Sequence, residues 1–324
     1  MKKLVSFVLA ATCVAFFSIK SIAQEVDVNE GIGLYNKATE AYNNKQYDQA
    51  IQYGNDAYKI AVDAGEEGTE LKKNMETLIP QLYLGKANSL VTEKKFDDAI
   101  AAFNEAKAVA EKYNSADVKV NIDEAFPKLY MAKGLAEFEA ETYDSAISSL
   151  DKAIEMYPNG AQAYLLKGAI YFKNKDYSNA ETAFLKCIEI GTETNDDSNV
   201  KGASTQLSTV YLLKAQEAMG AKKWADMLTA AEKSLAINES LNGYKMKGLA
   251  ATQLKKWDAV IEAYDKIITM GTEKDKPVAY HNIATAYQAK NNKSKACEFY
   301  KKLTNDANYK ANAEHNIKVV LKCN

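Results

Sequence analysis

The sequence predicts an all-α solenoid, in which about seven helix pairs stack on one another and a final helix caps the stack. Three observations predict it. The pattern aromatic-x-x-Ala recurs along the chain, a small residue recurs at a fixed distance before it, and the four prolines stand where repeats meet. Such self-similarity is typical of helical units that cannot bury their apolar faces alone and therefore stack.

Residues 1–23 have the pattern of a secretory signal peptide. Two lysines precede an apolar run that ends at Ile19, and the small residues Ser21 and Ala23 precede Gln24. A membrane anchor is the alternative, but the run is shorter than the roughly 20 apolar residues that a span needs. Cleavage would remove three lysines and no acidic residue, and would change the net charge from −2 to −5. The sequence therefore predicts an exported protein without a membrane span after cleavage.

Residues 24–308 form the predicted solenoid. When the Ala of the recurring pattern is placed at position 20 of a 34-residue frame, repeats 1 to 7 begin at 31, 80, 127, 161, 208, 241 and 277. Position 4 then holds Leu34, Tyr83, Tyr130, Tyr164, Tyr211, Tyr244 and Tyr280. Position 8 holds Ala38, Ala87, Gly134, Gly168, Ala215, Gly248 and Ala284. Small residues at position 8 let two helix backbones approach closely, and the aromatic residues fill the remaining volume.

These residues resemble the tetratricopeptide repeat (TPR) family, whose unit has an aromatic residue at position 4, a small one at 8 and Ala at 20. The clearest unit is 161–194, with matches at Tyr164, Gly168, Tyr171, Tyr177, Ala180 and Phe184. The resemblance covers residues 31–308, and the end repeats depart from it with Gly54 and Lys293 in aromatic positions. It implies a right-handed superhelix whose partners bind in a concave groove.

Each repeat is expected to be two amphipathic helices joined by a polar turn, such as 173–176. Additional residues precede repeats 2, 3 and 5, at 66–79, 113–126 and 195–207. The first two segments keep helical periodicity, which predicts longer helices that project beyond the solenoid edge, and 195–198 is expected to be a surface loop. Pro80, Pro127 and Pro277 fall at position 1 of the frame, a first-turn position where proline is tolerated. Where the additional residues extend the helix, Pro80 and Pro127 are expected to kink it. Residues 309–324 are expected to form the C-terminal cap helix.

Three cysteines follow the signal segment: Cys187, Cys297 and Cys323. Cys187 falls at an apolar position of the frame, which predicts a small buried side chain rather than a nucleophile. A disulfide between Cys297 and Cys323 would pin the C-terminus, whereas three unpaired thiols are the alternative, because spacing alone does not fix the separation of two Cα atoms. Both options stay open at this point.

The composition argues against several functions. The chain has 324 residues, 41 basic and 43 acidic, and every basic residue is Lys. Because Arg is the usual residue for bidentate phosphate recognition, a chain without it is a poor candidate for nucleic-acid or nucleotide binding. Two histidines, His281 and His315, leave little for a metal site. Without a phosphate loop, a zinc motif or a nucleophile elbow, the sequence predicts a non-enzymatic protein that needs no cofactor or metal.

The resemblance places a partner groove on the first helices of the repeats. Its candidate residues are Tyr35, Tyr42, Met131, Leu135, Phe138, Leu165, Phe172, Leu212, Met219, Lys245 and His281. An apolar groove floor suits an amphipathic helix or an extended apolar peptide. The alternative is that neighbouring helices or a second copy of the chain cover these side chains.

Position 7 is lysine in six repeats: Lys37, Lys86, Lys133, Lys167, Lys214 and Lys247. These side chains could form a basic ladder for an acidic partner or an anionic glycan. Alternatively, their stems pack and their ammonium groups lie among neighbouring carboxylates. The negative net charge of the mature chain favours the second interpretation.

The sequence thus predicts an exported, non-enzymatic scaffold that binds a protein or peptide. The alternatives are a soluble glycan-binding protein, suggested by the 20 tyrosines, and a self-associating protein of the cell envelope, for example a homodimer. The arginine-free, Asn- and Ile-rich composition and the Ala-Gln junction are similar to exported proteins of Bacteroidota. This similarity indicates the periplasm of a Gram-negative cell, or secretion.

Overall fold

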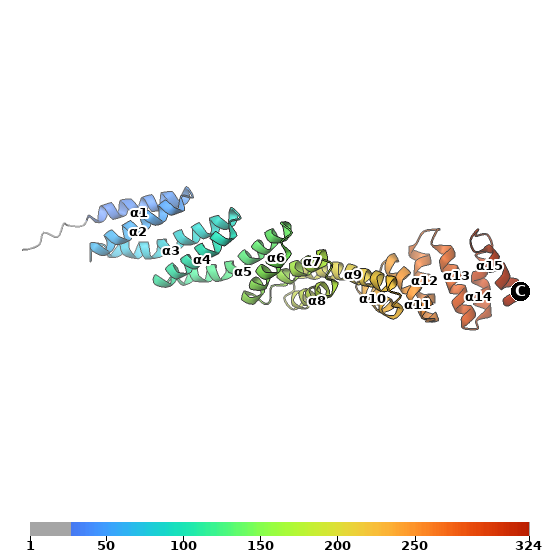
Figure 1. Cartoon of the computed structure of the whole chain (residues 1–324). Coiled ribbons are helices and arrows are strands. Elements are labelled where there is room, and N and C mark those ends of the chain that lie inside the picture. Colours follow the sequence, from blue (N-terminus) through green and yellow to red (C-terminus); the bar gives the residue numbers. More distant parts are fainter. Residues whose placement is uncertain (1–26, 324) are drawn as a thin grey trace, which may run out of the picture. The chain divides into compact units, whose positions relative to one another are not determined.

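The computed structural model describes residues 27–323, whose helices are labelled in Figure 1. The chain divides into two compact units, with the sequence boundary between Ile122 and Asp123. The predicted signal peptide and Cys13 lie outside the described residues. The first unit contains α1 (Val28–Asn43), α2 (Tyr47–Asp63), α3 (Thr69–Thr92) and α4 (Phe96–Lys112). The boundary between the units falls within α5 (Ala116–Glu139). Each described part is built from helices, and no strand occurs in 27–323.

The second unit continues with consecutive helix pairs. Its helices are α6 (Tyr143–Met156), α7 (Ala161–Lys173), α8 (Tyr177–Glu193), α9 (Asp197–Gly220), α10 (Trp224–Ile237), α11 (Leu241–Gln253), α12 (Trp257–Met270), α13 (Lys276–Ala289), α14 (Lys293–Lys301) and α15 (Lys310–His315), followed by a π-helical turn, Asn316–Val320. From α6 onward, each helix packs against the next one along the chain. The protein is therefore an all-α solenoid, as predicted.

The turn within each repeat contains one residue in the left-handed region. These residues are Lys45, Lys94, Glu141, Lys175, Lys222, Lys255 and Asn291, with φ between 55° and 61°. The next backbone N–H donates to the carbonyl five residues earlier, for example from Lys256 to Ala251 at 2.9 Å. This is the Schellman motif, which satisfies carbonyls at the end of a helix and usually has Gly at the left-handed position. Here the sequence uses Lys, Glu or Asn instead.

Three of the first helices are longer than the others. Helices α2, α4 and α8 have 17 residues, and each is followed by a first helix of 24 residues. The extensions do not project alone, because their apolar residues are buried against the longer second helix. Leu71 and Met75 of α3 pack with Ala57 and Ala61 of α2. The expected surface loop at 195–198 is confined to the turn, because α9 already begins at Asp197.

The prolines at position 1 of the frame have two different places in the helices. Pro80 and Pro127 lie inside α3 and α5, within the extended helices that the sequence predicts, and Pro277 lies at the start of α13, as expected. The additional residues lengthen α3 and α5 at their N-termini, so the frame start and the helix start differ in these repeats.

Small residues at positions 8 and 20 form the closest contacts between helices. Ala38, Ala87, Ala215 and Ala284 are fully buried, as are Ala50, Ala99, Ala146 and Ala180. A Cβ added at Gly168 would lie 2.6 Å from the ring of Phe184. These backbones therefore approach too closely for any side chain at position 8 larger than the one present.

The C-terminal cap is a short α-helix that continues into the π-helical turn. Ala313, Ile317 and Leu321 of this segment pack with Tyr300 and Leu303 at the end of the last repeat. Cys323 is disulfide-bonded to Cys297 of α14, with their Cα atoms 5.9 Å apart. Of the two options for these cysteines, the structure contains the bridge.

Candidate functional site

The predicted groove residues in the second unit lie on α5, α7, α9, α11 and α13. Leu135 of α5 and Met219 of α9 are the most open of the apolar ones, at 40% and 36% exposure. Leu165 of α7, Met131 and Leu212 are half-buried. Gly202 of α9 lies next to Leu165, so α7 and α9 are neighbours on this face. Of these five predicted apolar residues, two are thus exposed and three are half-buried.

Three of the aromatic residues predicted for the groove pack on aromatic residues at the adjacent turns. Tyr42 packs on Tyr47 with ring centroids 5.6 Å apart. Phe138 packs on Tyr143 at 6.0 Å, and Phe172 packs on Tyr177 at 6.1 Å. Each pair joins the end of a first helix to the start of its second helix. These side chains are therefore half-buried structural contacts. Tyr35, in the first unit, is likewise half-buried, against the Ala57 and Leu71 cluster.

The polar end of the predicted groove is occupied by contacts within the chain. The Lys245 Nζ lies 2.6 Å from Asp275, which also accepts from the backbone N–H and the hydroxyl of Thr272. These donors hold the pKa of Asp275 down at about 2. The His281 ring lies 5.0 Å from that of Tyr309 in the cap, and burial lowers its pKa. Both residues thus have contacts within the chain, although the Lys245 side chain is still 44% exposed and His281 is half-buried.

The lysines at position 7 each have a partner. The carboxylates of Asp48 and Glu262 lie 2.7 and 2.8 Å from Lys86 and Lys247. Lys167 pairs with Asp151, Lys214 with Glu181, and Lys133 with Glu137 at 3.9 Å. The remaining one, Lys37, lies over the ring of Tyr53 at 6.0 Å. The structure thus resolves the expected ladder into separate contacts, with ammonium groups among neighbouring carboxylates.

A second set of lysines recurs at one position of the repeat frame and was not predicted as a site from the sequence. Position 26 is Lys in repeats 3 to 7, and its ammonium lies over the position-4 tyrosine of the same repeat in four of them. The pairs are Lys152 over Tyr130 at 5.4 Å, Lys233 over Tyr211 at 5.0 Å, Lys266 over Tyr244 at 5.6 Å and Lys302 over Tyr280 at 5.3 Å. The repeated Lys was readable in the sequence, but a cation–π contact depends on how two helices face each other.

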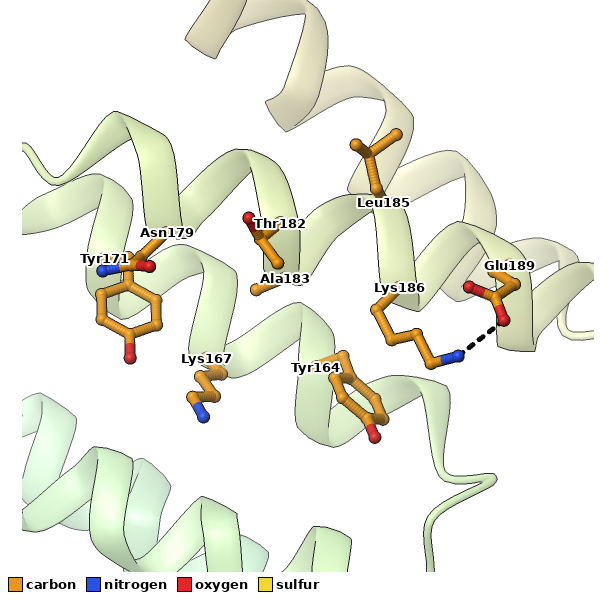
Figure 2. Close-up of a pocket in the computed structure, with 9 residues that line it drawn as sticks. All are labelled: Tyr164, Lys167, Tyr171, Asn179, Thr182, Ala183, Leu185, Lys186 and Glu189. Atoms are coloured by element: carbon orange, nitrogen blue, oxygen red, sulfur yellow. Dashed lines mark hydrogen bonds and ion pairs between the residues drawn. The ribbon is translucent and has the colours of Figure 1, made fainter.

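Repeat 4 is the exception. Its Lys186 turns away from the Tyr164 ring and pairs with Glu189 at 2.6 Å (Figure 2). Between α7 and α8 a cavity of about 430 Å³ is lined by Tyr164, Lys167 and Tyr171 from α7 and by Leu185, Lys186 and Glu189 from α8, among others. Figure 2 shows Tyr164, Lys167 and Tyr171 projecting from the same side of α7. We call this space the repeat-4 cavity.

Other chemistry-bearing groups have structural surroundings. Cys187 is fully buried, and burial raises the pKa of its thiol to about 11. Residues 27–323 contain no group of three or more His, Cys, Asp or Glu arranged to hold a metal ion. Within the same range, every helix is too short or too polar to cross a bilayer.

The fold and its surface define a class of protein, an α-solenoid of helix hairpins. Family models described as tetratricopeptide repeat match residues 131–192 and 277–305. The chain therefore contains tetratricopeptide repeats in these two segments. The two matched segments contain repeats 3, 4 and 7, including the repeat-4 cavity.

Several solved structures are similar to this chain. The MamA protein is 22% identical, with a TM-score of 0.35, over 58% of this chain and 94% of that one. YrrB, described as a TPR protein with an unusual peptide-binding site, is 19% identical, with a TM-score of 0.35, over 63% and 97%. A tetratricopeptide repeat protein from Parabacteroides merdae is 13% identical, with a TM-score of 0.29, over 91% and 100%. Comparison with curated proteins found no match.

Proposed function

We propose that this protein is an exported, non-enzymatic scaffold that binds a protein or peptide through the first helices of its repeats. The observation that carries the proposal is that Leu135 of α5 and Met219 of α9, apolar side chains on first helices, are 40% and 36% exposed. Exposed apolar side chains are candidates for contact with a partner. An amphipathic helix or extended apolar segment is the partner that such a surface fits.

Export is supported by two independent features. Residues 1–23 have the charge, the apolar run and the small-residue exit of a signal peptide. The disulfide between Cys297 and Cys323 fits an oxidising compartment, because such bonds persist outside the cytosol and are rare inside it. We place the protein in the periplasm or outside the cell.

The proposal is tested by crosslinking in intact cells, followed by purification and identification of the attached proteins. We expect one recurring partner for the wild type and its loss in the double variant Leu135→Asp and Met219→Asp. The matched control is Met156→Asp with Met270→Asp, because these methionines are as exposed, at 49% and 42%, but end second helices. The control should keep the partner.

Two results would overturn the proposal. Crosslinks only between copies of this chain would show a self-associating structural protein instead. Absence of any protein partner, together with retention of the purified protein on a glycan array, would show the glycan-binding alternative.

A further inference from the structure

Repeat 5 shows how a carboxylate fits between the residues at positions 4, 7 and 26. Glu181 of α8 accepts from the hydroxyl of Tyr211 at 2.9 Å and from Lys233 at 3.1 Å, and it also pairs with Lys214. Burial of Glu181 opposes ionisation, but the hydrogen bonds from Lys214, Tyr211 and Lys233 outweigh it and hold its pKa below the ordinary value. A carboxylate supplied by the preceding repeat therefore neutralises this set of donors.

Repeat 6 repeats the arrangement with a carboxylate from a different place. Glu239, in the turn before α11, accepts from the Tyr244 hydroxyl at 2.8 Å and from Lys266 at 3.0 Å. The equivalent tyrosine and lysine thus bind a carboxylate in two consecutive repeats, even though the chain delivers it from a helix in one case and from a turn in the other. The two repeats thus share the tyrosine and lysine donors, whereas the position of the accepting carboxylate in the sequence differs.

Repeat 4 has the same donors, Tyr164, Lys167 and Lys186, but receives no such carboxylate. The place of Glu181 in the preceding repeat is taken by Ile147, which packs in the apolar cluster of α6 and α7, and the place of Glu239 is taken by Pro158. Among residues 27–323, no side chain is hydrogen-bonded to the Tyr164 hydroxyl. The donors surround the repeat-4 cavity instead.

Repeat 7 also lacks a carboxylate at both acceptor places, but its lysine keeps the ring contact. The two acceptor places in its preceding repeat are Ile261 and Thr272, and Lys302 lies over the ring of Tyr280 at 5.3 Å. In repeat 4, by contrast, Lys186 does not lie over the ring of Tyr164. It pairs with Glu189, an exposed residue on the same helix, α8. An exposed pair of this kind contributes little to stability and exchanges readily for another acceptor.

We propose that the repeat-4 cavity binds a carboxylate of a partner protein, held by the Tyr164 hydroxyl and the ammonium groups of Lys186 and Lys167. The chain's own Glu181 and Glu239 occupy the equivalent sites of the next two repeats, which identifies the chemical class of the ligand. The volume of about 430 Å³ admits a side chain or a chain end together with its neighbours. Asp151 and Glu189, which now pair with the two lysines, are half exposed and return to water when the ligand binds.

The carboxylate could come from an acidic side chain or from a C-terminus, and three short peptides distinguish these sources. The first carries one internal Glu and a C-terminal amide, the second replaces Glu by Gln and has a free C-terminus, and the third has Gln and an amide. Each is titrated into the isotopically labelled protein while amide chemical shifts of α7 and α8 are followed by NMR. We expect saturable shifts with the first or the second peptide and none with the third.

The variant Lys186→Gln is expected to weaken binding of the responsive peptide by about tenfold, the effect of losing a charge-assisted hydrogen bond. The matched control is Lys266→Gln, which removes the equivalent lysine of repeat 6, where Glu239 already occupies the site, and should bind normally. A second variant, Ile147→Glu, supplies repeat 4 with its own carboxylate and should abolish binding, and its circular dichroism spectrum checks that the protein is still folded.

Three results would overturn the inference: no shift in α7 and α8 with either carboxylate peptide, equal affinity in Lys186→Gln, or shifts spread over many surface lysines. The cavity proposal rests on the proposed function only in assuming that the carboxylate belongs to a protein. The groove proposal and the cavity proposal can fail separately. A partner that is lost in the variant Leu135→Asp and Met219→Asp but retained in Lys186→Gln would support the groove and contradict the cavity site.

Discussion

The ring of Phe184 on α8 lies against the backbone of Gly168 on α7, so that a methyl group added at Gly168 would be 2.6 Å from the ring carbons. Phe184 is fully buried in a core cluster of the second unit. The glycine at position 8 is therefore required by the packing of the two helices of repeat 4.

The variant Gly168→Ala should lower the free energy of unfolding by about 1–3 kcal/mol, the usual effect of overpacking, even though Ala is a better helix former than Gly. Chemical denaturation followed by circular dichroism measures it. The control is Gly220→Ala at the end of α9, where an added Cβ meets nothing within 4 Å. That control should be neutral or stabilising, and a stabilising effect of Gly168→Ala would contradict the close contact.

The left-handed turn residues offer a route to greater stability. Lys255 has φ of 55° in the Schellman turn between α11 and α12, and an L-residue in this region is strained by roughly 1 kcal/mol relative to Gly. We expect Lys255→Gly to raise the free energy of unfolding by about that amount. The neighbouring variant Lys256→Gly, at φ of −84°, should bring no gain. Equal effects of the two variants would argue against the assigned turn geometry.

The disulfide should contribute measurably to the stability of the last repeat. It closes a loop with a sequence separation of 26 residues, for which the chain-entropy estimate is about 3.5 kcal/mol. Addition of dithiothreitol, or the variant Cys323→Ser, is expected to lower the melting temperature of the C-terminal part.

Mass spectrometry after alkylation of the unfolded, unreduced protein provides the direct check. Only Cys187 should be labelled, together with Cys13 where residues 1–23 are still present. Labelling of Cys297 and Cys323 before reduction would show that the bridge is absent.

The cap should loosen as the pH falls below neutrality. Burial lowers the pKa of His281 in the folded protein below its ordinary value of 6.5, so the unfolded state binds the proton more tightly. The contribution of neutral His281 to stability is therefore complete above pH 6.5, and it is lost as the pH falls toward the pKa of His281 in the folded protein. Melting temperatures at pH 7.5 and pH 5.5 should differ more for the wild type than for His281→Gln. The same pH dependence in both proteins would mean that other groups cause it.

The repeat frame predicted the helix pairs because they depend on local spacing. Position 8 must be small and position 4 large wherever two helices pack, and Gly168 with Tyr164 follow this rule directly. The helix starts at Thr69 and Ala116 were harder to predict, because they depend on whether the additional residues can be buried against another helix. Leu71 and Met75, for example, are buried against α2, which the repeat pattern does not show.

The candidate site was less accessible to sequence reasoning. Whether a side chain such as Phe172 is open or packed depends on the neighbouring turn, and its contact with Tyr177 is not visible in the repeat pattern. The ion pair between Lys245 and Asp275 likewise joins two repeats. The lysines at position 26 could have been found by aligning the repeats, but the departure of Lys186 from that pattern required the structure.

Photocrosslinking in intact cells tests the central claim, that this solenoid binds another protein on its first helices, most directly. A photoreactive amino acid replaces Leu135 in one sample and the exposed Met270 of α12 in another. We predict that position 135 yields a discrete adduct with a protein other than this chain, whereas position 270 does not. Adducts only with a second copy of the chain, or the same adducts from both positions, would contradict the claim.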